Sequence, residues 1–338
     1  MERRQIGKTK LHLSILGFGG APLGNLYTAV SEAEAQKSLT AAWEAGRRFF
    51  DTAPFYGYGL SERRVGDALR PHPRDEFVLS TKVGRLICRG WDESKTREMF
   101  ASPMPFHAAF EYSYDGVMRS VEDSYQRLGL DRIDIVLLHD IGRMTHGEHH
   151  AAMMKSAMEG GYRALDELRR SGQIGAIGLG VNETAVCEEA MEHGDFDCFL
   201  LAGRYTLLEQ GSLESFFPRC QAKGISVIIG GPFNSGILAR GDQPDATYNY
   251  SAAPQDIRDR VTRLGEICRR HGVSMPAAAL QFVLAHPVVA SVIPGARNAA
   301  EAASHTEMLK VSIPGAFWSD LRGSGLLHPA APVPAVAA

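Results

Sequence analysis

The feature that most constrains this chain is a set of polar side chains at the ends of consecutive apolar runs. Asp51 and Lys82 each follow a short strand-like run, and His139 follows a third. Tyr56 lies five residues after Asp51, in a glycine-rich bend that leads into a helix. In a parallel β/α barrel the carboxyl ends of the strands meet at one mouth, where catalytic groups gather. We therefore expect a carboxylate, a phenol, an ammonium and an imidazole to share one pocket.

The segments that contain these four residues resemble the aldo-keto reductase superfamily, whose catalytic tetrad is Asp, Tyr, Lys and His. The matching segments are Asp51–Gly57, Ser80–Lys82 and Leu137–Ile141, and the resemblance extends over residues 4–309. Within the superfamily, the sequence is similar to the sugar 1-dehydrogenases that act on L-fucose, D-threo-aldoses or L-galactose. Pyridoxal 4-dehydrogenase is a relative in the same group.

The order of the expected elements indicates the fold class. Eight short β-rich runs alternate with helical patterns, which is typical of an α/β fold of the (β/α)8 TIM-barrel type. Residues 4–13 are expected to form an N-terminal β-hairpin that caps the bottom of the barrel. Two segments, 84–112 and 142–152, are expected to be long active-site loops. We expect a single domain over residues 1–325 and a disordered Ala/Pro-rich tail over 326–338.

Charge and cysteine usage exclude several classes of protein. The net charge of −3 and the lack of a basic run give no general attraction to nucleic acid or anionic lipid. No stretch approaches the roughly 18 uninterrupted apolar residues of a membrane span. Five cysteines without a C-x-x-C pair argue against a disulfide framework and fit a reducing compartment. We expect a cytoplasmic protein that binds a small molecule and neither nucleic acid nor membrane, with its oligomeric state unspecified by the sequence.

The four polar groups have the chemistry needed for hydride transfer, in which a proton moves at oxygen while a hydride moves at carbon. Tyr56 is the expected proton carrier, and a nearby Lys82 ammonium is expected to lower the pKa of its phenol. Asp51 would keep Lys82 charged and in place, and His139 would orient the substrate oxygen. Taken singly, each residue also has a structural interpretation, as a loop cap, a pocket wall, a surface charge or a core histidine. The set of four at successive strand ends favours catalysis.

A hydride carrier is also implied. No G-x-G-x-x-G segment follows a strand, so a Rossmann site is not expected. The resemblance instead implies a nicotinamide dinucleotide across the barrel mouth, with Asn182 on its carboxamide. Glycines at the end of the first strand, Gly19 among them, let a ligand approach the backbone. The positions implied for the cofactor are Gly19, Asn182, Gly230, Pro232, Phe233, Asn234, Gly236, Leu238, Pro294, Gly295, Ala296, Arg297, Glu301 and His305.

The sequence departs from the family pattern at several of these positions. Val181 stands in place of the usual serine and Ala202 in place of a glutamine that often assists. Gly230 replaces the aromatic residue that often stacks on the nicotinamide, and His305 replaces the usual asparagine near the adenine.

Two charged residues bear on the choice between NAD and NADP. NADP-preferring relatives often carry an arginine where this chain has Glu301, whose carboxylate would repel a 2′-phosphate and accept a bond from a free 2′-hydroxyl. Arg297 has the opposite effect, because it can pair with a phosphate. We expect NAD as the cofactor, with NADP as the alternative.

Substrate contacts are expected from Tyr58, Trp91 and Arg204. The run His146–His150 has three histidines, but they are crowded into an expected loop rather than set at i, i+4 on a helix, and no cysteine is near, so we expect a solvated loop and no metal.

The resemblance implies oxidation of the anomeric C1 hydroxyl of an aldose of the L-fucose or D-threo type to the lactone. Three alternatives remain open: oxidation of pyridoxal at C4, a general NADPH-dependent aldehyde reductase, and a non-catalytic barrel subunit that senses the nucleotide. A metal-dependent barrel hydrolase is disfavoured, because the strand ends offer lysine and tyrosine rather than several histidines and aspartates.

Overall fold

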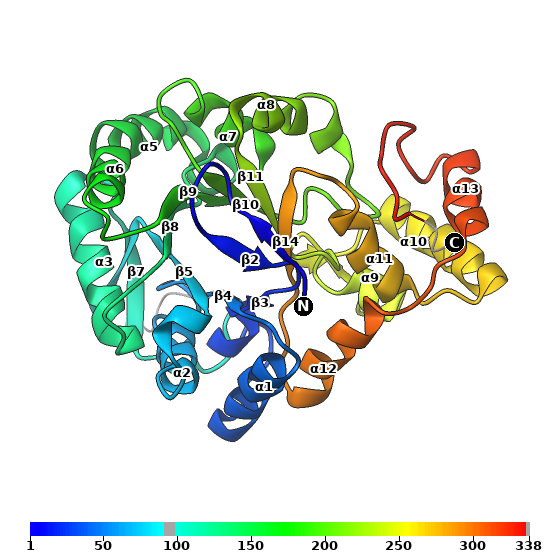
Figure 1. The fold of residues 1–338 in the computed structure, drawn as a ribbon, viewed down its shortest axis with the longest axis horizontal. Helices are drawn as coiled ribbons and strands as arrows, with labels where there is room; N and C mark the ends of the chain where they lie inside the picture. Colours follow the sequence, from blue (N-terminus) through cyan, green and yellow to red (C-terminus); the bar gives the residue numbers. More distant parts are fainter. Residues whose placement is uncertain (91–98, 336–338) are drawn as a thin grey trace.

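The computed structural model describes residues 1–90 and 99–335 and is built around a parallel eight-stranded barrel (Figure 1). The strands follow one another around the barrel in the order β14-β11-β10-β9-β8-β5-β4-β3. Their bounds are β3 (Phe18–Gly19), β4 (Phe49–Asp51), β5 (Val78–Val83), β8 (Ile135–His139), β9 (Ala176–Val181), β10 (Cys198–Ala202), β11 (Ser226–Gly230) and β14 (Val289–Ile293). The architecture confirms the predicted (β/α)8 TIM barrel.

Closure depends on the short first strand. Parallel bridges join Leu16 to Val292 and Gly19 to Gly295, so β3 meets β14 across the seam. A Cβ atom at Gly19 would lie 2.7 Å from the Ile293 carbonyl oxygen, so a larger residue at this position would push the two edges apart.

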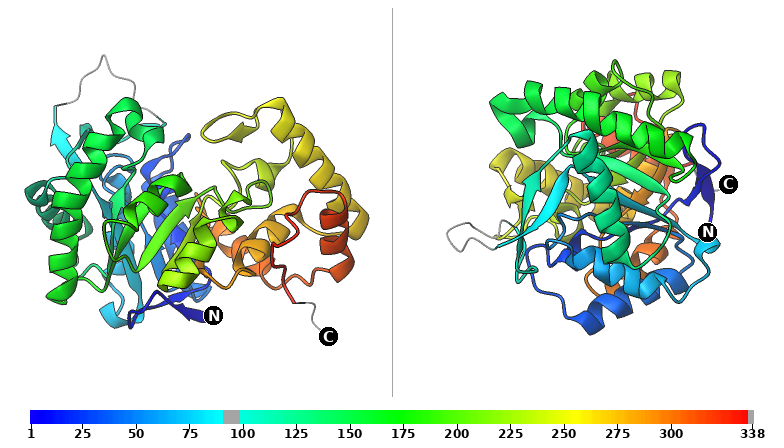
Figure 2. Two further views of the ribbon diagram at one scale, coloured as in Figure 1. Left: turned by 90° about the horizontal axis from the view of Figure 1, so that it is seen from above. Right: turned by 90° about the vertical axis from the view of Figure 1, so that its left-hand side faces the viewer.

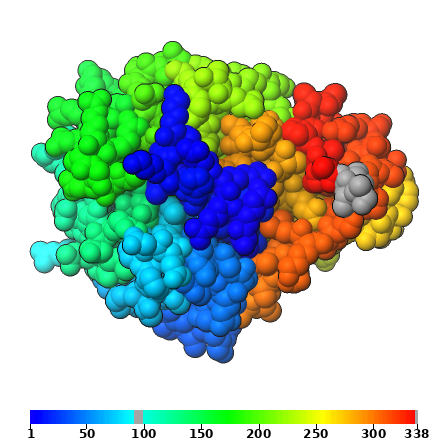
Figure 3. Space-filling view, in the orientation of Figure 1, coloured from blue at the N-terminus to red at the C-terminus, as the bar shows by residue number. Residues whose placement is uncertain are grey.

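The bottom of the barrel is covered by the predicted hairpin of β1 (Arg3–Gln5) and β2 (His12–Ser14). Figure 3 shows this segment spread over the centre of the molecule, and Figure 2 shows it at the end opposite β6 and β7. The open mouth therefore lies at the carboxyl ends of the strands, as in other barrels of this class.

Amphipathic helices surround the barrel, and side chains cap the first turn of some of them. The Ser31 hydroxyl accepts a bond from the Glu34 amide at 3.2 Å, and the Asn298 side chain accepts one from the Glu301 amide at 2.9 Å. The main outer helices are α1 (Glu32–Glu44), α2 (Leu60–Leu69), α3 (Tyr114–Leu128), α6 (Arg163–Arg170), α7 (Thr184–Ala190), α8 (Phe216–Lys223), α10 (Gln255–His271), α11 (Met275–Leu284) and α12 (Ala299–Met308).

The two long insertions are more regular than expected from their sequence. Segment 84–112 contains an antiparallel hairpin of β6 (Arg85–Arg89) and β7 (Phe106–Phe110). Segment 142–152 contains α4 (Arg143–His146), a 3-10 turn at Gly147–His149 and the start of α5 (His150–Ser156). A π-helical segment, Ala157–Tyr162, then joins α5 to α6. In segment 84–112, Phe100 packs against the rings of Phe55 and Tyr58, so the aromatic residues there do not follow the periodicity of a single element.

Short elements also interrupt the loop after β11, which was expected to run from 232 to 251 without structure. It contains α9 (Ile237–Arg240) and a small hairpin of β12 (Thr247–Tyr248) and β13 (Ser251–Ala252). Brief 3-10 turns occur elsewhere in the chain, at Ala21–Gly24, Arg74–Glu76 and Gly211–Leu213. Among the described residues, no helix has the length and apolar character needed to cross a membrane.

The C-terminal segment differs from the expected disordered tail. Helix α13 (Gly315–Gly323) packs beside α10, and the chain after it stays on the protein surface up to residue 335 (Figure 2). Leu327 is only 3% exposed, and Arg322 donates a bond to the Ala331 carbonyl at 2.7 Å. The Ala/Pro-rich composition of this segment led to the prediction of disorder. Two buried leucines and one arginine are nevertheless enough to hold a short segment against the domain.

We expect Leu327→Ala to lower the free energy of unfolding by about 2–5 kcal/mol, because it deletes a buried side chain and leaves a cavity. The control is Val311→Ala at a position that is 40% exposed, which should change stability by less than about 0.5 kcal/mol. Urea unfolding of both variants measures the difference. Equal free energies of unfolding for the two variants would show that the segment around Leu327 is not packed against the domain.

Candidate active site

A buried ion pair between two neighbouring strands lies at the centre of the barrel mouth. Asp51 ends β4 and Lys82 lies near the end of β5, and the Lys82 ammonium donates to Asp51 Oδ2 at 2.8 Å. The ammonium also donates to the Thr52 carbonyl at 2.9 Å, and the Ser80 hydroxyl donates to Asp51 Oδ1 at 2.7 Å. Both charged side chains are at most 2% exposed. The pair is therefore satisfied by hydrogen bonds on both sides, as a buried charge requires.

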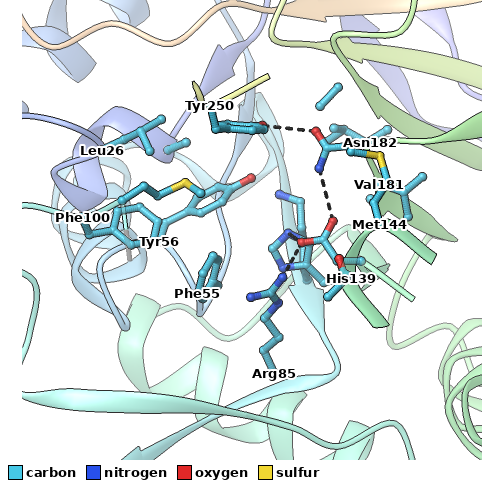
Figure 4. A pocket seen from close by; sticks show the side chains of 18 residues that line it. Leu26, Phe55, Tyr56, Arg85, Phe100, His139, Met144, Val181, Asn182 and Tyr250 are labelled. Atoms are coloured by element: carbon cyan, nitrogen blue, oxygen red, sulfur yellow. Dashed lines mark hydrogen bonds and ion pairs between the residues drawn. The ribbon is translucent and has the colours of Figure 1, made fainter. Parts of the chain in front are cut away.

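A glycine on β9, Gly180, gives the Lys82 side chain room inside the barrel. A Cβ atom at Gly180 would lie 3.0 Å from Lys82 Cε. The lysine then ends next to Tyr56, with its ammonium nitrogen 4.7 Å from the centre of the tyrosine ring. Tyr56 projects from the loop between β4 and α2, and its hydroxyl points into the centre of the pocket (Figure 4).

The pKa of Lys82 agrees with the expectation from the sequence, whereas the pKa of Tyr56 does not. Burial lowers the pKa of Lys82, but the charges of Asp51 and Tyr56 outweigh it, so its pKa is raised and the ammonium stays charged. Burial raises the pKa of Tyr56 above its ordinary value, and the charge and hydrogen bonding of Lys82 offset only part of that rise. The predicted net lowering of the Tyr56 pKa is thus wrong for the protein alone, because desolvation of a buried phenolate outweighs one nearby cation.

His139, at the end of β8, is neutral. Burial, followed by the positive charges of Arg85 and Lys82, holds its pKa well below the ordinary range. Its ring centre lies 6.0 Å from that of Tyr56, with the two rings nearly perpendicular at 86°. His139 Nδ1 is buried without a hydrogen-bond partner. A neutral imidazole beside the phenol can exchange one hydrogen bond with a substrate oxygen and adds no positive charge.

The tyrosine, lysine and histidine line one cavity of about 290 Å³. Its two walls differ in character (Figure 4): Leu26, Phe55 and Phe100 form an apolar side, and Arg85 and Asn182 lie across the cavity from Leu26 and Phe100. The full lining is Ala21, Leu26, Phe55, Tyr56, Lys82, Arg85, Met99, Phe100, His139, Asp140, Met144, Thr145, Gly180, Val181, Asn182, Leu200, Ala202 and Tyr250.

Four polar residues of this cavity were not predicted from the sequence, Arg85, Asp140, Thr145 and Tyr250, and three of them join one hydrogen-bonded chain with Asn182. Arg85 donates to Asp140 Oδ2 at 2.6 Å, Asp140 Oδ1 lies 3.5 Å from Asn182 Nδ2, and Tyr250 donates to Asn182 Oδ1 at 3.2 Å. The sequence could have indicated Asp140 as a cavity residue, because it directly follows His139 at the end of an apolar run. Arg85 and Tyr250 come from the insertions after β5 and β11, where no local pattern indicates which side chains turn inward.

The residues expected at the nicotinamide and pyrophosphate take several different positions. Asn182 lines the cavity, while Gly19 and Gly230 lie in the barrel strands at its mouth. Asn234 is 3% exposed and uses its amide to bond Thr206 and the Gly203 carbonyl, and Leu238 is fully buried, so the side chains of both hold the loop itself. The remaining positions in this loop that stay partly accessible are Phe233 and Gly236, while Pro232 is buried.

The adenosine-side residues lie by a second cavity, of about 300 Å³, lined by Arg297, Asn298 and Glu301 together with residues 28–31 and Glu34. Arg297 and Glu301, whose predicted effects on cofactor choice were opposed, bind each other. Arg297 Nη2 lies 2.9 Å from Glu301 Oε1, and the Arg297 amide donates to Oε2 at 2.9 Å. Burial works against the Glu301 carboxylate, but its bonds to Arg297 hold its pKa below the ordinary value.

The other residues of the adenosine segment are covered by the fold to different degrees. Pro294 and Ala296 are buried, while Gly295 is partly accessible and bridges to Gly19. His305 is 5% exposed beside the Phe233 ring, and burial lowers its pKa to about 4, so it is uncharged at neutral pH.

The three residues expected at the substrate are placed elsewhere or lie outside the description. Tyr58 is 3% exposed, packs against the rings of Phe55 and Phe100, and is not part of the cavity lining. Arg204 lies behind the cavity and donates to the Asn182 carbonyl at 2.6 Å, so it positions that residue. Trp91 falls outside the described residues.

The histidine-rich run is used for packing. His146 contacts the rings of Phe110 and Tyr112, and His150 is 2% exposed and bonds Glu189 at 2.8 Å. These two histidines therefore support the mouth of the barrel, which corrects the expectation of a solvated loop for this part of the run.

Comparison with known proteins places these observations in a family. The model of the aldo/keto reductase family matches residues 15–324. Pyridoxal 4-dehydrogenase of Microbacterium luteolum is 44% identical, with 96% of this chain and 98% of that protein aligned. D-threo-aldose 1-dehydrogenase of a Pseudomonas species is 38% identical over 94% of this chain and 95% of its own length. The holo form of an aldo-keto reductase from Bacillus halodurans superposes with a TM-score of 0.74 at 27% identity, covering 98% of this chain and 97% of that one.

We expect Tyr56 in the cofactor-free protein to remain a neutral phenol up to at least its ordinary pKa of 10.0, because burial outweighs the effect of Lys82. An absorbance titration of the wild type minus Tyr56→Phe isolates the tyrosinate signal of this one residue. Tyrosinate appearing in the difference below pH about 9 would contradict the raised pKa.

Proposed function

Because the chain belongs to the aldo/keto reductase family and is an NAD(P)-dependent oxidoreductase, we propose that it oxidises the hemiacetal carbon of a cyclic substrate to a lactone. The preferred substrate is an aldose, oxidised at its anomeric C1 hydroxyl. The observation that carries this proposal is that Tyr56, Lys82 and a neutral His139 line one cavity, with Asp51 paired to Lys82 behind it.

In this proposal Tyr56 is the proton acceptor. The phenol would first release its own proton to solvent, and the resulting phenolate oxygen would take the proton of the C1 hydroxyl. The Lys82 ammonium stabilises the negative charge of that phenolate. Asp51 keeps Lys82 protonated and aimed at the phenol. His139, being neutral, orients the reacting oxygen by one hydrogen bond. The nicotinamide, when bound, supplies the acceptor for the C1 hydride.

The two walls of the cavity support a sugar-sized substrate. A pyranose ring has apolar C–H faces and a rim of hydroxyls, so it matches an apolar side formed by Leu26, Phe55 and Phe100 and a polar side formed by Arg85 and Asp140. The relative named for a D-threo-aldose favours the same substrate class.

A second candidate substrate is pyridoxal, and one observation favours it. The relative named for pyridoxal oxidation is 44% identical over nearly the whole chain. Pyridoxal also closes into a cyclic hemiacetal, so the same four residues would perform the same proton and hydride transfer. Its flat ring would lie against the apolar side of the cavity.

The positions of the candidate cofactor residues support a dinucleotide that spans the barrel mouth. Asn182 lies in the cavity with Tyr56, and Glu301 lines the second cavity at the start of α12. A Cβ atom at Gly236, in the loop after β11, would meet nothing within 4 Å, so this part of the loop leaves room for a ligand. We propose NAD as the preferred cofactor, because the Arg297 guanidinium already binds Glu301.

We also propose a cytoplasmic location. All five cysteines are free thiols, and burial raises the pKa of Cys187, Cys198 and Cys220, which keeps these three in the unreactive thiol form. Such thiols suit a reducing compartment.

Purified protein with NAD⁺ and L-fucose, L-galactose, D-arabinose or pyridoxal should produce reduced nicotinamide, followed by its absorbance. We expect Tyr56→Phe to lower kcat by about 10²–10⁴-fold, because the proton acceptor is removed while the ring is kept. Loss of cofactor binding in Tyr56→Phe would make it an unsuitable control, so binding is measured for both proteins. Full activity of the variant would overturn the assignment of Tyr56.

Glu301→Gln should shift cofactor preference toward NADP by about tenfold in the ratio of dissociation constants, because it removes a repelling charge and frees Arg297. Titration of each nucleotide by protein fluorescence measures the ratio. Glu307→Gln is the matched control, since Glu307 lies on the same helix, pairs with Lys310 at 2.7 Å and does not line the second cavity. An unchanged ratio in Glu301→Gln would show that Arg297 and Glu301 do not determine cofactor choice.

A further inference from the structure

A second ion pair lies in the cavity, and the proton and hydride transfer described above does not use it. Arg85 Nη2 and Asp140 Oδ2 are 2.6 Å apart, and both side chains are at most 12% exposed. Both residues line the cavity with the candidate catalytic residues. A buried ion pair contributes little net stability when both charges lose their water, so stability alone is a weak reason for its presence in a pocket.

Arg85 is held firmly in place. Its guanidinium carbon lies 3.9 Å from the centre of the Phe55 ring and 4.7 Å from that of Phe110, so the cation is between two aromatic rings. Its Nε is buried and donates no hydrogen bond to any residue within 1–90 and 99–335. An unpartnered buried donor of this kind costs free energy unless another group accepts its hydrogen bond.

Asp140 is held next to the reacting position. Its backbone has φ of +50°, a conformation that residues other than glycine rarely adopt. Its amide donates a hydrogen bond to the Gly180 carbonyl at 3.0 Å. This turn directs the carboxylate into the cavity, with Oδ2 3.4 Å from His139 Nε2. Oδ1 has only a long contact of 3.5 Å, to Asn182 Nδ2, so it retains capacity to accept a hydrogen bond.

We propose that Asp140, positioned by Arg85, recognises the hydroxyl on the carbon next to the one that is oxidised, which in an aldose is the C2 hydroxyl. This inference rests on the proposed function, since it places the reacting oxygen at His139. Adjacent hydroxyls of a sugar lie about 3 Å apart, so a reacting oxygen bound at His139 brings its neighbouring hydroxyl within reach of the Asp140 carboxylate, whose Oδ2 is 3.4 Å from His139 Nε2 and whose Oδ1 can still accept. Asp140 is thus a specificity residue and Arg85 a positioning residue.

The chemistry of the pair suits a hydroxyl better than a charged group. A carboxylate accepts a strong, charge-assisted hydrogen bond from a hydroxyl, and Arg85 neutralises it so that the pocket does not repel uncharged substrates or attract cations. A substrate that lacks the hydroxyl would leave the Asp140 carboxylate desolvated and under-bonded in the closed pocket, which is the basis of strong rejection.

The first test compares three pentoses with the wild-type holoenzyme. D-arabinose and D-ribose differ only at C2, and 2-deoxy-D-ribose is the deoxy analogue of both. We expect at least one of the two epimers to have a kcat/KM about 10–100-fold above that of the deoxy sugar, which corresponds to loss of one hydrogen bond to a charged group. Equal values for an active epimer and the deoxy sugar would overturn the inference while leaving the proposed function intact.

The second test uses variants. Asp140→Asn should lower kcat/KM for the preferred epimer and bring its ratio to the deoxy sugar within about threefold of one. Asp134→Asn is the matched control: Asp134 precedes the same strand, β8, lies 2.6 Å from Arg74, and is not part of the cavity lining. The control should lose stability and keep the full ratio. Loss of the ratio in both variants, or in neither, would contradict a specific role of Asp140.

Two further measurements keep the inference falsifiable if Asp140→Asn fails to fold or no pentose is oxidised. Arg85→Lys keeps the positive charge and loses the planar fork, so it should lower the same ratio. Calorimetric titration of the three pentoses into the wild type measures recognition without turnover. Oxidation of pyridoxal with no pentose bound or oxidised would overturn the inference and leave hemiacetal oxidation standing, whereas turnover of none of the substrates would overturn the proposed function itself.

Discussion

The site depends on the buried pair of Lys82 and Asp51. Removing either partner of such a pair leaves an isolated charge in a medium that solvates it poorly, at a cost of about 3–5 kcal/mol. The barrel supports the pair with bonds from Ser80 and to the Thr52 carbonyl, and it leaves space for the lysine by having Gly180 on the facing strand. Strand register therefore determines the chemistry, because a slip of β5 by one residue would turn Lys82 away from Asp51 and Tyr56.

The charges of the mouth are arranged so that they cancel locally. Lys82 is paired with Asp51 and Arg85 with Asp140, and His139 lies near both cations. Those cations, added to burial, keep the imidazole neutral. A protonated imidazole here would add a third positive charge next to the phenol. The neutral form leaves Lys82 as the cation adjacent to Tyr56 and limits His139 to hydrogen bonding.

The sequence predicts the parts of this arrangement that follow from strand periodicity. Asp51, Lys82 and His139 lie at strand ends, and parallel strands bring those ends together, so their meeting could be inferred without coordinates. Arg85 and Tyr250 reach the cavity from insertions, and their direction depends on the pairing of β6 with β7 and on the turn at residues 249–250. The sequence also indicated Tyr58 and Arg204 as substrate contacts, but tertiary packing placed one behind Phe55 and used the other to hold Asn182.

The same limit applies to charges that the sequence shows singly. Arg297 and Glu301 were expected to act on a cofactor in opposite directions, yet four residues of separation across a helix start lets them bind each other. Arg85 and Asp140 are 55 positions apart and also form a pair. In both cases the group that a ligand would meet is the pair rather than either residue. Ligand recognition at a pocket therefore depends on which charges are already paired in the folded chain. That pairing depends on contacts between loops, which local sequence patterns do not encode.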